Sequence, residues 1–309
     1  MRVLVTGAAG YVGQAVVAVL RSANHDPIAM VHSSSPQIAD ASETRAADLL
    51  DDDALRRAVD GVDAVCHLAG LTRVRESLRH PLGYFRVNTG GTIALLEAMA
   101  YAQVPRLVFA STGAIYGAPK RQPMNEDLPP EPPHPYAASK YAAELAIEAQ
   151  AQAGGIAGSI VRLPNVAGGA DSDPTRLIPR ALTAAVQNEA LEVNGDGTAV
   201  RDYVHIADVA AAFVASLEHL PPMGVVKRYN IGSGHGTSVL EVVAAVERAT
   251  GRTVRLRYKP PVPEPLVLIN DPTKALAEIS WRPEWSDIDT IVRDAWTATL
   301  EKSSNVTSC

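Results

Sequence analysis

The sequence predicts an α/β protein built on a doubly wound parallel sheet, with a second, smaller mixed α/β unit. Three observations lead to this prediction. Short apolar runs alternate with alanine-rich helical stretches through the first half of the chain, glycines separate the first run from the first helical stretch, and the alternation stops near residue 165. Such alternation is typical of right-handed βαβ units, whose parallel strands are covered by helices. The pattern therefore predicts a Rossmann-type sheet.

The elements of this sheet follow one another in strict order. We expect strands at residues 2–6, 27–32, 64–70, 106–111 and 159–165, and helices at residues 12–23, 52–61, 86–102 and 136–152. Each expected strand is a short apolar run, whereas each expected helix is long enough for several turns and rich in good helix formers. Residues 1–164 are therefore expected to form the sheet.

The character of the chain changes after residue 164. A glycine-rich polar segment at 167–176 is followed by stretches that no longer alternate regularly. We expect residues 165–309 to form mainly the smaller unit, which is interleaved with the first because residues 200–220 are predicted to return to it. Prolines gather at 123–135 and 260–265, and proline disfavours helix interiors and central strands, so we expect surface loops there.

Composition narrows the possible functions. The 309-residue chain has a net charge of -6 and no cluster of lysine and arginine, which argues against a nucleic-acid or anionic-membrane surface. It contains no apolar run of about 18 residues and no signal peptide, so we expect a cytoplasmic protein. The two cysteines, Cys66 and Cys309, form neither a disulfide framework nor a metal-binding spacing.

A glycine trio lies between the first strand and the first helix. In "VTGAAGYVG" the spacing of Gly7, Gly10 and Gly13 permits a tight turn, close approach of the backbone to a pyrophosphate, and close packing of the helix. The N–H groups at the helix N-terminus add an anion-binding end. We therefore predict that residues 1–164 bind a dinucleotide, with Gly7, Gly10, Tyr11 and Val12 among the contacts.

The choice between NAD and NADP is open at this stage. The acid that would bind a ribose 2′-hydroxyl is expected at the end of the second strand, where this chain has His32 followed by two serines. His32 and these serines suit either a 2′-phosphate or a solvent loop. The fold context favours NAD without excluding NADP, and Asp48 and Leu49 are expected at the adenine edge.

The chemistry is predicted from a tyrosine and a lysine on one helix. Tyr136 and Lys140 are four residues apart, so they lie on one face about one turn apart. A nearby ammonium favours the phenolate of a tyrosine, so the pair suits proton transfer near neutral pH. The strand end "STGAIYG" supplies the hydroxyl of Thr112 and a second tyrosine, Tyr116, which competes for this role.

Taken together, these motifs resemble a known family. "VTGAAGYVG", "STGAIYG", "PYAASK", "RLPNVAG" and "VRDYVHIADVAAA" occur in the order found in the extended short-chain dehydrogenase/reductase branch, the NAD-dependent epimerase/dehydratase family. The resemblance implies a tightly held NAD that takes a hydride from carbon 4 of a nucleotide-activated hexose or hexuronate and returns it to the other face. It also implies a homodimer formed through the helices that contain "LLEAMAYA" and "SKYAAELAIEAQ".

The same resemblance assigns roles to individual residues. It makes Tyr136 the base, Lys140 its partner and a ribose ligand, and Thr112 the hydroxyl that links Tyr136 to the sugar, and it leaves Tyr116 to packing. It places three further residues near the nicotinamide half of the cofactor: Ala69, Asn88 and Pro164.

Two positions after Thr112 limit the reaction. Sugar dehydratases of this branch carry an Asp-Glu pair there, to supply acid and base for the elimination of water, whereas this chain has Gly113 and Ala114. The resemblance therefore implies hydride transfer without elimination.

For the substrate, the resemblance implies contacts from Asn165, Arg201 and Asp271. An arginine makes charge-assisted bonds to phosphate, and the alternative for Arg201 is a surface pair with Asp202. The chain departs from the family at two positions. It has Asn194 where the family has an aromatic residue against the base of the nucleotide, and it lacks an arginine at 260–265. An NADPH-dependent ketone reductase and a non-catalytic dinucleotide-binding regulator therefore remain as alternatives.

Overall fold

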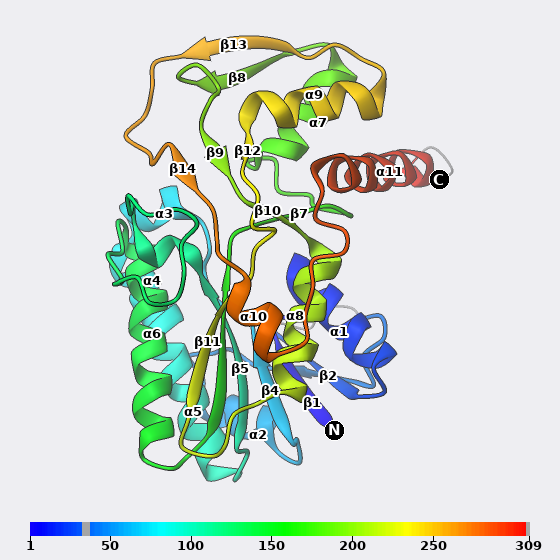
Figure 1. Cartoon of the computed structure of the whole chain (residues 1–309). Coiled ribbons are helices and arrows are strands. Elements are labelled where there is room, and N and C mark those ends of the chain that lie inside the picture. The colour runs from blue at the N-terminus through cyan, green and yellow to red at the C-terminus, as the bar shows by residue number, and fades with distance from the viewer. Residues whose placement is uncertain (33–37, 307–309) are drawn as a thin grey trace.

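The computed structural model describes residues 1–32 and 38–306, and its centre is a seven-stranded parallel sheet (Figure 1). The strand order is β11-β6-β5-β4-β1-β2-β3. The strands are β1 (Arg2–Thr6), β2 (Asp26–Val31), β3 (Glu43–Ala46), β4 (Ala64–His67), β5 (Arg106–Thr112), β6 (Ala157–Leu163) and β11 (Val226–Asn230). The predicted fold class is confirmed.

Helices cover both faces of this sheet because successive residues of each strand point to opposite sides. Helices α1 (Tyr11–Ser22) and α8 (Ile206–Glu218) cover one face, and α2 (Asp52–Val59), α5 (Gly91–Tyr101) and α6 (Pro135–Gln152) cover the other. In β1, Val3 and Val5 pack toward α1 and α8, whereas Leu4 packs toward the other three helices.

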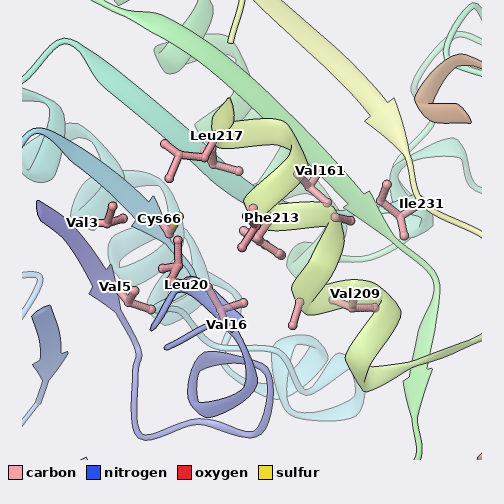
Figure 2. Close-up of a cluster of buried hydrophobic side chains, with 14 of the residues drawn as sticks. Val3, Val5, Val16, Leu20, Cys66, Val161, Val209, Phe213, Leu217 and Ile231 are labelled. Carbon is pink, nitrogen blue, oxygen red and sulfur yellow. The ribbon is translucent and has the colours of Figure 1, made fainter. Parts of the chain in front are cut away.

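Figure 2 shows the core between the sheet and the first pair of helices. Val16 and Leu20 of α1 meet Val209 and Phe213 of α8, and all four side chains are fully buried. Burying one such side chain stabilises the fold by roughly 1.5–3 kcal/mol. This core keeps α1 and α8 against the sheet, and with them the glycine turn that precedes α1.

A second unit lies beyond the carboxyl ends of the strands (Figure 1). Its core contains Leu182, Val193, Val246 and Val292. Its main elements are α7 (Leu177–Gln187), β8 (Ala190–Asn194), α9 (Val239–Thr250), β13 (Arg255–Lys259) and α11 (Ile288–Val306). Short pieces connect it to the sheet: β7 (Asn165–Ala167), β9 (Val200–Arg201), β10 (Tyr203–His205), β12 (Thr237–Ser238), β14 (Val267–Leu268) and α10 (Thr273–Glu278).

The sequence pattern does not predict two of the seven strands, β3 and β11. Both lie at the edges of the sheet and carry charged residues, in "ETRA" and "VKRYN". Charged side chains on edge strands discourage pairing with other chains, and they interrupt the apolar run that marks an inner strand. The pattern therefore detects the five inner strands and misses the two edges.

Two absences concern the described part of the chain alone. None of its helices has the length and apolar character needed to cross a bilayer. Nor do the same residues bring three or more His, Cys, Asp or Glu side chains together in a way that would hold a metal ion.

Candidate active site

The candidate site lies at the carboxyl ends of β1, β4, β5 and β6, where the strand order reverses between β1 and β4. Ligands of open α/β sheets bind in the crevice at this point. A cavity of about 770 Å³ opens there. Its lining includes six of the predicted site residues: Val12, Thr112, Tyr136, Lys140, Pro164 and Asn165.

The glycine turn between β1 and α1 is sterically restricted to glycine. Gly7 has a φ of +69°, and a Cβ atom there would lie 2.8 Å from the backbone nitrogen of Ala69. A Cβ atom on Gly13 would lie 2.2 Å from the carbonyl oxygen of Gly7. Helix α1 begins after Gly10 with no side-chain cap, so its first N–H groups are left for an anion. The turn thus has the close backbone approach and the open N–H groups that a pyrophosphate site requires.

Tyr11, the first residue of α1, reaches toward the second unit. Its hydroxyl donates a 2.5 Å hydrogen bond to the carbonyl oxygen of Gly168, and the guanidinium of Arg176 lies 5.3 Å from its ring centroid. Burial raises the pKa of this phenol, so it stays neutral and acts as a donor. Tyr11 therefore joins the glycine turn to the loop after β7.

At the ends of β2 and β3, His32 meets Asp48. The two side chains are 3.1 Å apart, and His32 is 81% exposed. The other oxygen of Asp48 accepts a hydrogen bond from the backbone of Leu50. The serines that follow His32 lie outside the described residues. This edge therefore does carry a carboxylate, which comes from the end of β3 rather than of β2.

Asn88 holds the loop after β4 in place. It lies in a π-helical turn, Phe85–Gly90, and bonds both the N–H and the carbonyl of Leu71. Its amide also donates to the hydroxyl of Ser139 on α6. In the same loop, Ala69 donates its N–H to the hydroxyl of Thr6 in β1. Asn88 is thus occupied by protein contacts and positions the loop beside Lys140.

Tyr136 lies in the first turn of α6, which begins after His134. The imidazole of His134 caps the helix by accepting from the N–H of Ala137, and its ring stacks 5.9 Å from that of Tyr136. The ring of Tyr84 meets Tyr136 edge-on at 6.4 Å. Burial raises the pKa of Tyr136, whereas the neighbouring hydroxyl of Thr112 lowers it. The ring of Tyr136 is therefore fixed in place, and its pKa depends on the groups around it.

Lys140 follows one turn later, on the same face of α6, and is 4% exposed. Its ammonium group lies 4.2 Å from the ring centroid of Phe109 in β5. Burial lowers the pKa of Lys140 to about 7, against the opposing effect of the Glu144 carboxylate. A lysine with this pKa changes charge near neutral pH, as a partner in proton transfer requires.

Thr112 ends β5, and its hydroxyl accepts the N–H of Ala114 to cap a short 3₁₀ turn. A Cβ atom on Gly113 would lie 2.6 Å from the amide oxygen of Asn270, so this position has no room for a carboxylate. Tyr116 is buried, accepts from Arg162 and donates to Asn230. It does not line the cavity, so of the two competing tyrosines it is Tyr136 that is available to a ligand there.

Sequence reasoning missed a buried polar network under the site. Glu144 accepts hydrogen bonds from Ser111 and from two nitrogens of Arg162, at 2.6 and 3.1 Å for the latter. Arg162 also donates to Tyr116 at 2.6 Å. Ser111 precedes Thr112, and Glu144 follows Lys140 by one turn, so the network ties both catalytic candidates to β6. The spacing of Lys140 and Glu144 on one helix face was the available signal.

A second cavity, of about 970 Å³, lies in the second unit and adjoins the first. Arg201 and Asn194 line it. Arg201 lies 3.5 Å from Glu264, not in a pair with Asp202, which is buried and accepts from Ser233 and Asn270.

Asp271 is not brought to either cavity. Its carboxylate accepts two hydrogen bonds from Thr273, at 3.0 and 2.6 Å, and so fixes the start of α10. Three carboxylates line the second cavity, those of Glu192, Asp196 and Glu264, and the last of these lies in the proline-rich segment, beside Arg201.

A glycine turn and a tyrosine-lysine pair at the switch point of a parallel sheet are the parts expected of a dinucleotide-dependent hydride-transfer site. The chain belongs to the NAD dependent epimerase/dehydratase family, whose model matches residues 3–232. The family predicted from the sequence is thereby confirmed.

Individual relatives match nearly the whole chain. A UDP-glucose 4-epimerase of Streptomyces lividans is 38% identical, over 95% of this chain and 94% of the relative. The crystal structure of a UDP-glucose 4-epimerase from Stenotrophomonas maltophila, with bound NAD and formylated UDP-arabinopyranose, has a TM-score of 0.92 at 31% identity and covers 99% of both chains. MoeE5, in complex with UDP-glucuronic acid and NAD, has a TM-score of 0.89 at 29% identity and covers 98% of this chain and all of its own.

Proposed function

We propose that the chain is an NAD-dependent 4-epimerase of a nucleotide-activated sugar, a UDP-hexose or UDP-hexuronate. The observation that carries the proposal is the shared cavity of Thr112, Tyr136 and Lys140 at the switch point of the sheet, with no carboxylate at residues 113 and 114. The full-length similarity to UDP-glucose 4-epimerases supports the same activity.

The residues that follow the carboxyl ends of β1 and β3 fit NAD. Gly7 and Gly10 leave space for a pyrophosphate at the start of α1, and Asp48 supplies a carboxylate at the edge where a ribose hydroxyl is expected. A 2′-phosphate there would meet the negative charge of Asp48, so this edge favours NAD over NADP. When bound, NAD supplies the acceptor and donor chemistry for a hydride at carbon 4 of the sugar.

Proton transfer is the task of the protein. Tyr136 takes the proton of the 4-hydroxyl as carbon 4 is oxidised and returns it when the ketone is reduced. Burial opposes ionisation of this phenol, and the hydroxyl of Thr112 and the charge of Arg176 act in the other direction. Lys140, one turn later, stabilises the phenolate of Tyr136 when the lysine is protonated and positively charged. Thr112 orients the sugar oxygen toward Tyr136.

The missing carboxylates explain why the reaction stops at hydride transfer. Elimination of water needs an acid and a base beside the 4-keto sugar. Gly113 and Ala114 supply neither, and Asn270 closes the space beside Gly113. The ketone therefore keeps its neighbouring hydroxyl until the hydride returns.

The test combines cofactor and product. The purified protein is denatured and the released ligand identified by mass spectrometry, and the native protein is incubated with UDP-galactose while UDP-glucose and NADH are monitored. We expect NAD in the released fraction, formation of UDP-glucose and no accumulation of NADH. Release of NADP would instead identify a reductase, as would oxidation of added NADPH in the presence of a ketone substrate without epimerisation.

We also propose a cytoplasmic homodimer. Ile93 and Tyr101 of α5 and Leu145 of α6 are 43%, 77% and 47% exposed, on adjacent helices that cover one face of the sheet. An apolar surface on two neighbouring helices suits a four-helix contact between two copies. Light scattering of the wild type and of Leu145→Asp tests this, because a charge at the contact is expected to yield monomers.

The division of labour between the two parts remains a proposal as well. We propose that residues 1–164, with the returning segment around 200–220, bind the dinucleotide, and that most of residues 165–309 binds the nucleotide sugar. Asn165 and Arg201 are the substrate contacts proposed within the second part. Their positions in two adjoining cavities support this assignment.

A further inference from the structure

The two cavities meet at a few shared residues. The cavity around Tyr136 and the cavity around Arg201 have four lining residues in common: Arg75, Thr175, Leu177 and Tyr203. In a nucleotide sugar the diphosphate joins the sugar to the nucleoside. A sugar with carbon 4 at Tyr136 and a nucleoside in the second cavity would therefore place the diphosphate at this junction. The argument rests on the proposed function.

Arg75 is the charged residue among the four. It lies in α3 (Val74–Arg79), a short helix in the connection after β4, and its side chain is exposed. No carboxylate of residues 1–32 and 38–306 lies within ion-pair distance of its guanidinium, and no hydrogen bond from its side chain is formed within this part of the chain. It also lines a third, smaller cavity beside the junction.

The other basic residues of the second cavity already have partners. Arg201 pairs with Glu264, Lys259 pairs with Glu192, and Arg180 donates to the carbonyl oxygen of Glu192. A phosphate that bound one of them would compete with an existing contact. A phosphate at Arg75 would not, and a guanidinium can bind it through two parallel hydrogen bonds.

Arg75 also supplies a positive charge that the family resemblance leads one to expect elsewhere in the chain. Residues 260–265 lack the arginine that the family resemblance leads one to expect, and Pro261 faces the second cavity instead. We infer that Arg75 binds the diphosphate of the nucleotide sugar and takes the place of that arginine. The contact then comes from the connection after β4, so the diphosphate bridges the sheet and the second unit.

The experiment compares two ligands that differ only in phosphate. Binding of UDP and of uridine is measured by calorimetry for the wild type, Arg75→Ala, Arg75→Lys and Arg57→Ala. Arg57 is an exposed arginine of α2 that lines neither cavity, so its removal changes the net charge equally. Epimerisation of UDP-galactose is followed in parallel.

Arg75→Ala is expected to weaken UDP roughly ten- to hundredfold, the usual effect of losing a charge-assisted bond, and to leave uridine unchanged. The KM for UDP-galactose should rise with it while kcat changes less. Arg75→Lys should lie in between, and Arg57→Ala should match the wild type.

Two other results are distinguishable. If the wild type binds UDP and epimerises UDP-galactose, and Arg75→Ala binds UDP equally well, the role of Arg75 is overturned and the proposed function stands. A wild type that neither binds UDP nor epimerises overturns the proposed function, and this inference with it.

Discussion

Replacing Glu144 with glutamine tests whether the network beneath the site is as desolvated as its geometry indicates. The side chains of Glu144 and Arg162 are 0% and 2% exposed, and the carboxylate accepts three hydrogen bonds. Breaking a buried pair by neutralising one partner costs about 3–5 kcal/mol, because the remaining charge is left without compensation. We therefore expect Glu144→Gln to lower the free energy of unfolding by about this amount.

The measurement is urea unfolding followed by circular dichroism, with a matched control one turn further along α6. Glu148 pairs with Arg228, but these side chains are 18% and 38% exposed, so Glu148→Gln should cost about 0–1 kcal/mol. A double replacement of Glu144 and Arg162 by methionine should recover much of the loss, because it removes both charges. A cost for Glu144→Gln no larger than that of Glu148→Gln would refute the reasoning.

Two further predictions concern the site, and a third concerns His67, the buried last residue of β4. Tyr136→Phe should lower kcat by roughly 10²–10⁴-fold without releasing NAD, as checked by epimerase assay and mass spectrometry, and unchanged turnover would remove Tyr136 as the base. Gly7→Ala should abolish copurification of NAD, because its Cβ would lie 2.8 Å from the nitrogen of Ala69, whereas retention of NAD would contradict the proposed pyrophosphate site. Burial lowers the pKa of His67 to about 3, so the unfolded chain takes up a proton first as the pH falls. Stability is therefore lost below about pH 6.5, by roughly 3 kcal/mol at about pH 4.5. His67→Gln should reduce this acid sensitivity in urea titrations at several pH values, whereas the exposed His219→Gln should not, and equal sensitivity in both would argue against His67.

The parts of the fold that the sequence predicted are those set by local patterns. The inner strands are apolar runs, the glycines of the first turn are required by a φ above zero and by close backbone contacts, and Tyr136 and Lys140 share a helix face because of their spacing. The edge strand β3 has no such pattern. The carboxylate of Asp48 reaches His32 only because β2 and β3 pair side by side, a contact between residues 16 apart.

The residues of the second cavity are even harder to predict from local sequence patterns. Asp271 and Glu264 are both acids near the end of the second unit, and the sequence offers no local reason to prefer one for the cavity. The path of the chain decides between them: β13 pairs with β8, and β14 pairs with β9, so the proline-rich segment between β13 and β14 passes over the second cavity and carries Glu264 to Arg201. Asp271 comes after β14, where its carboxylate is taken up by Thr273. A residue's place in a motif therefore predicts its role when its neighbours in sequence are also its neighbours in space, as for Tyr136 and Lys140, but not when distant strand pairing sets its position.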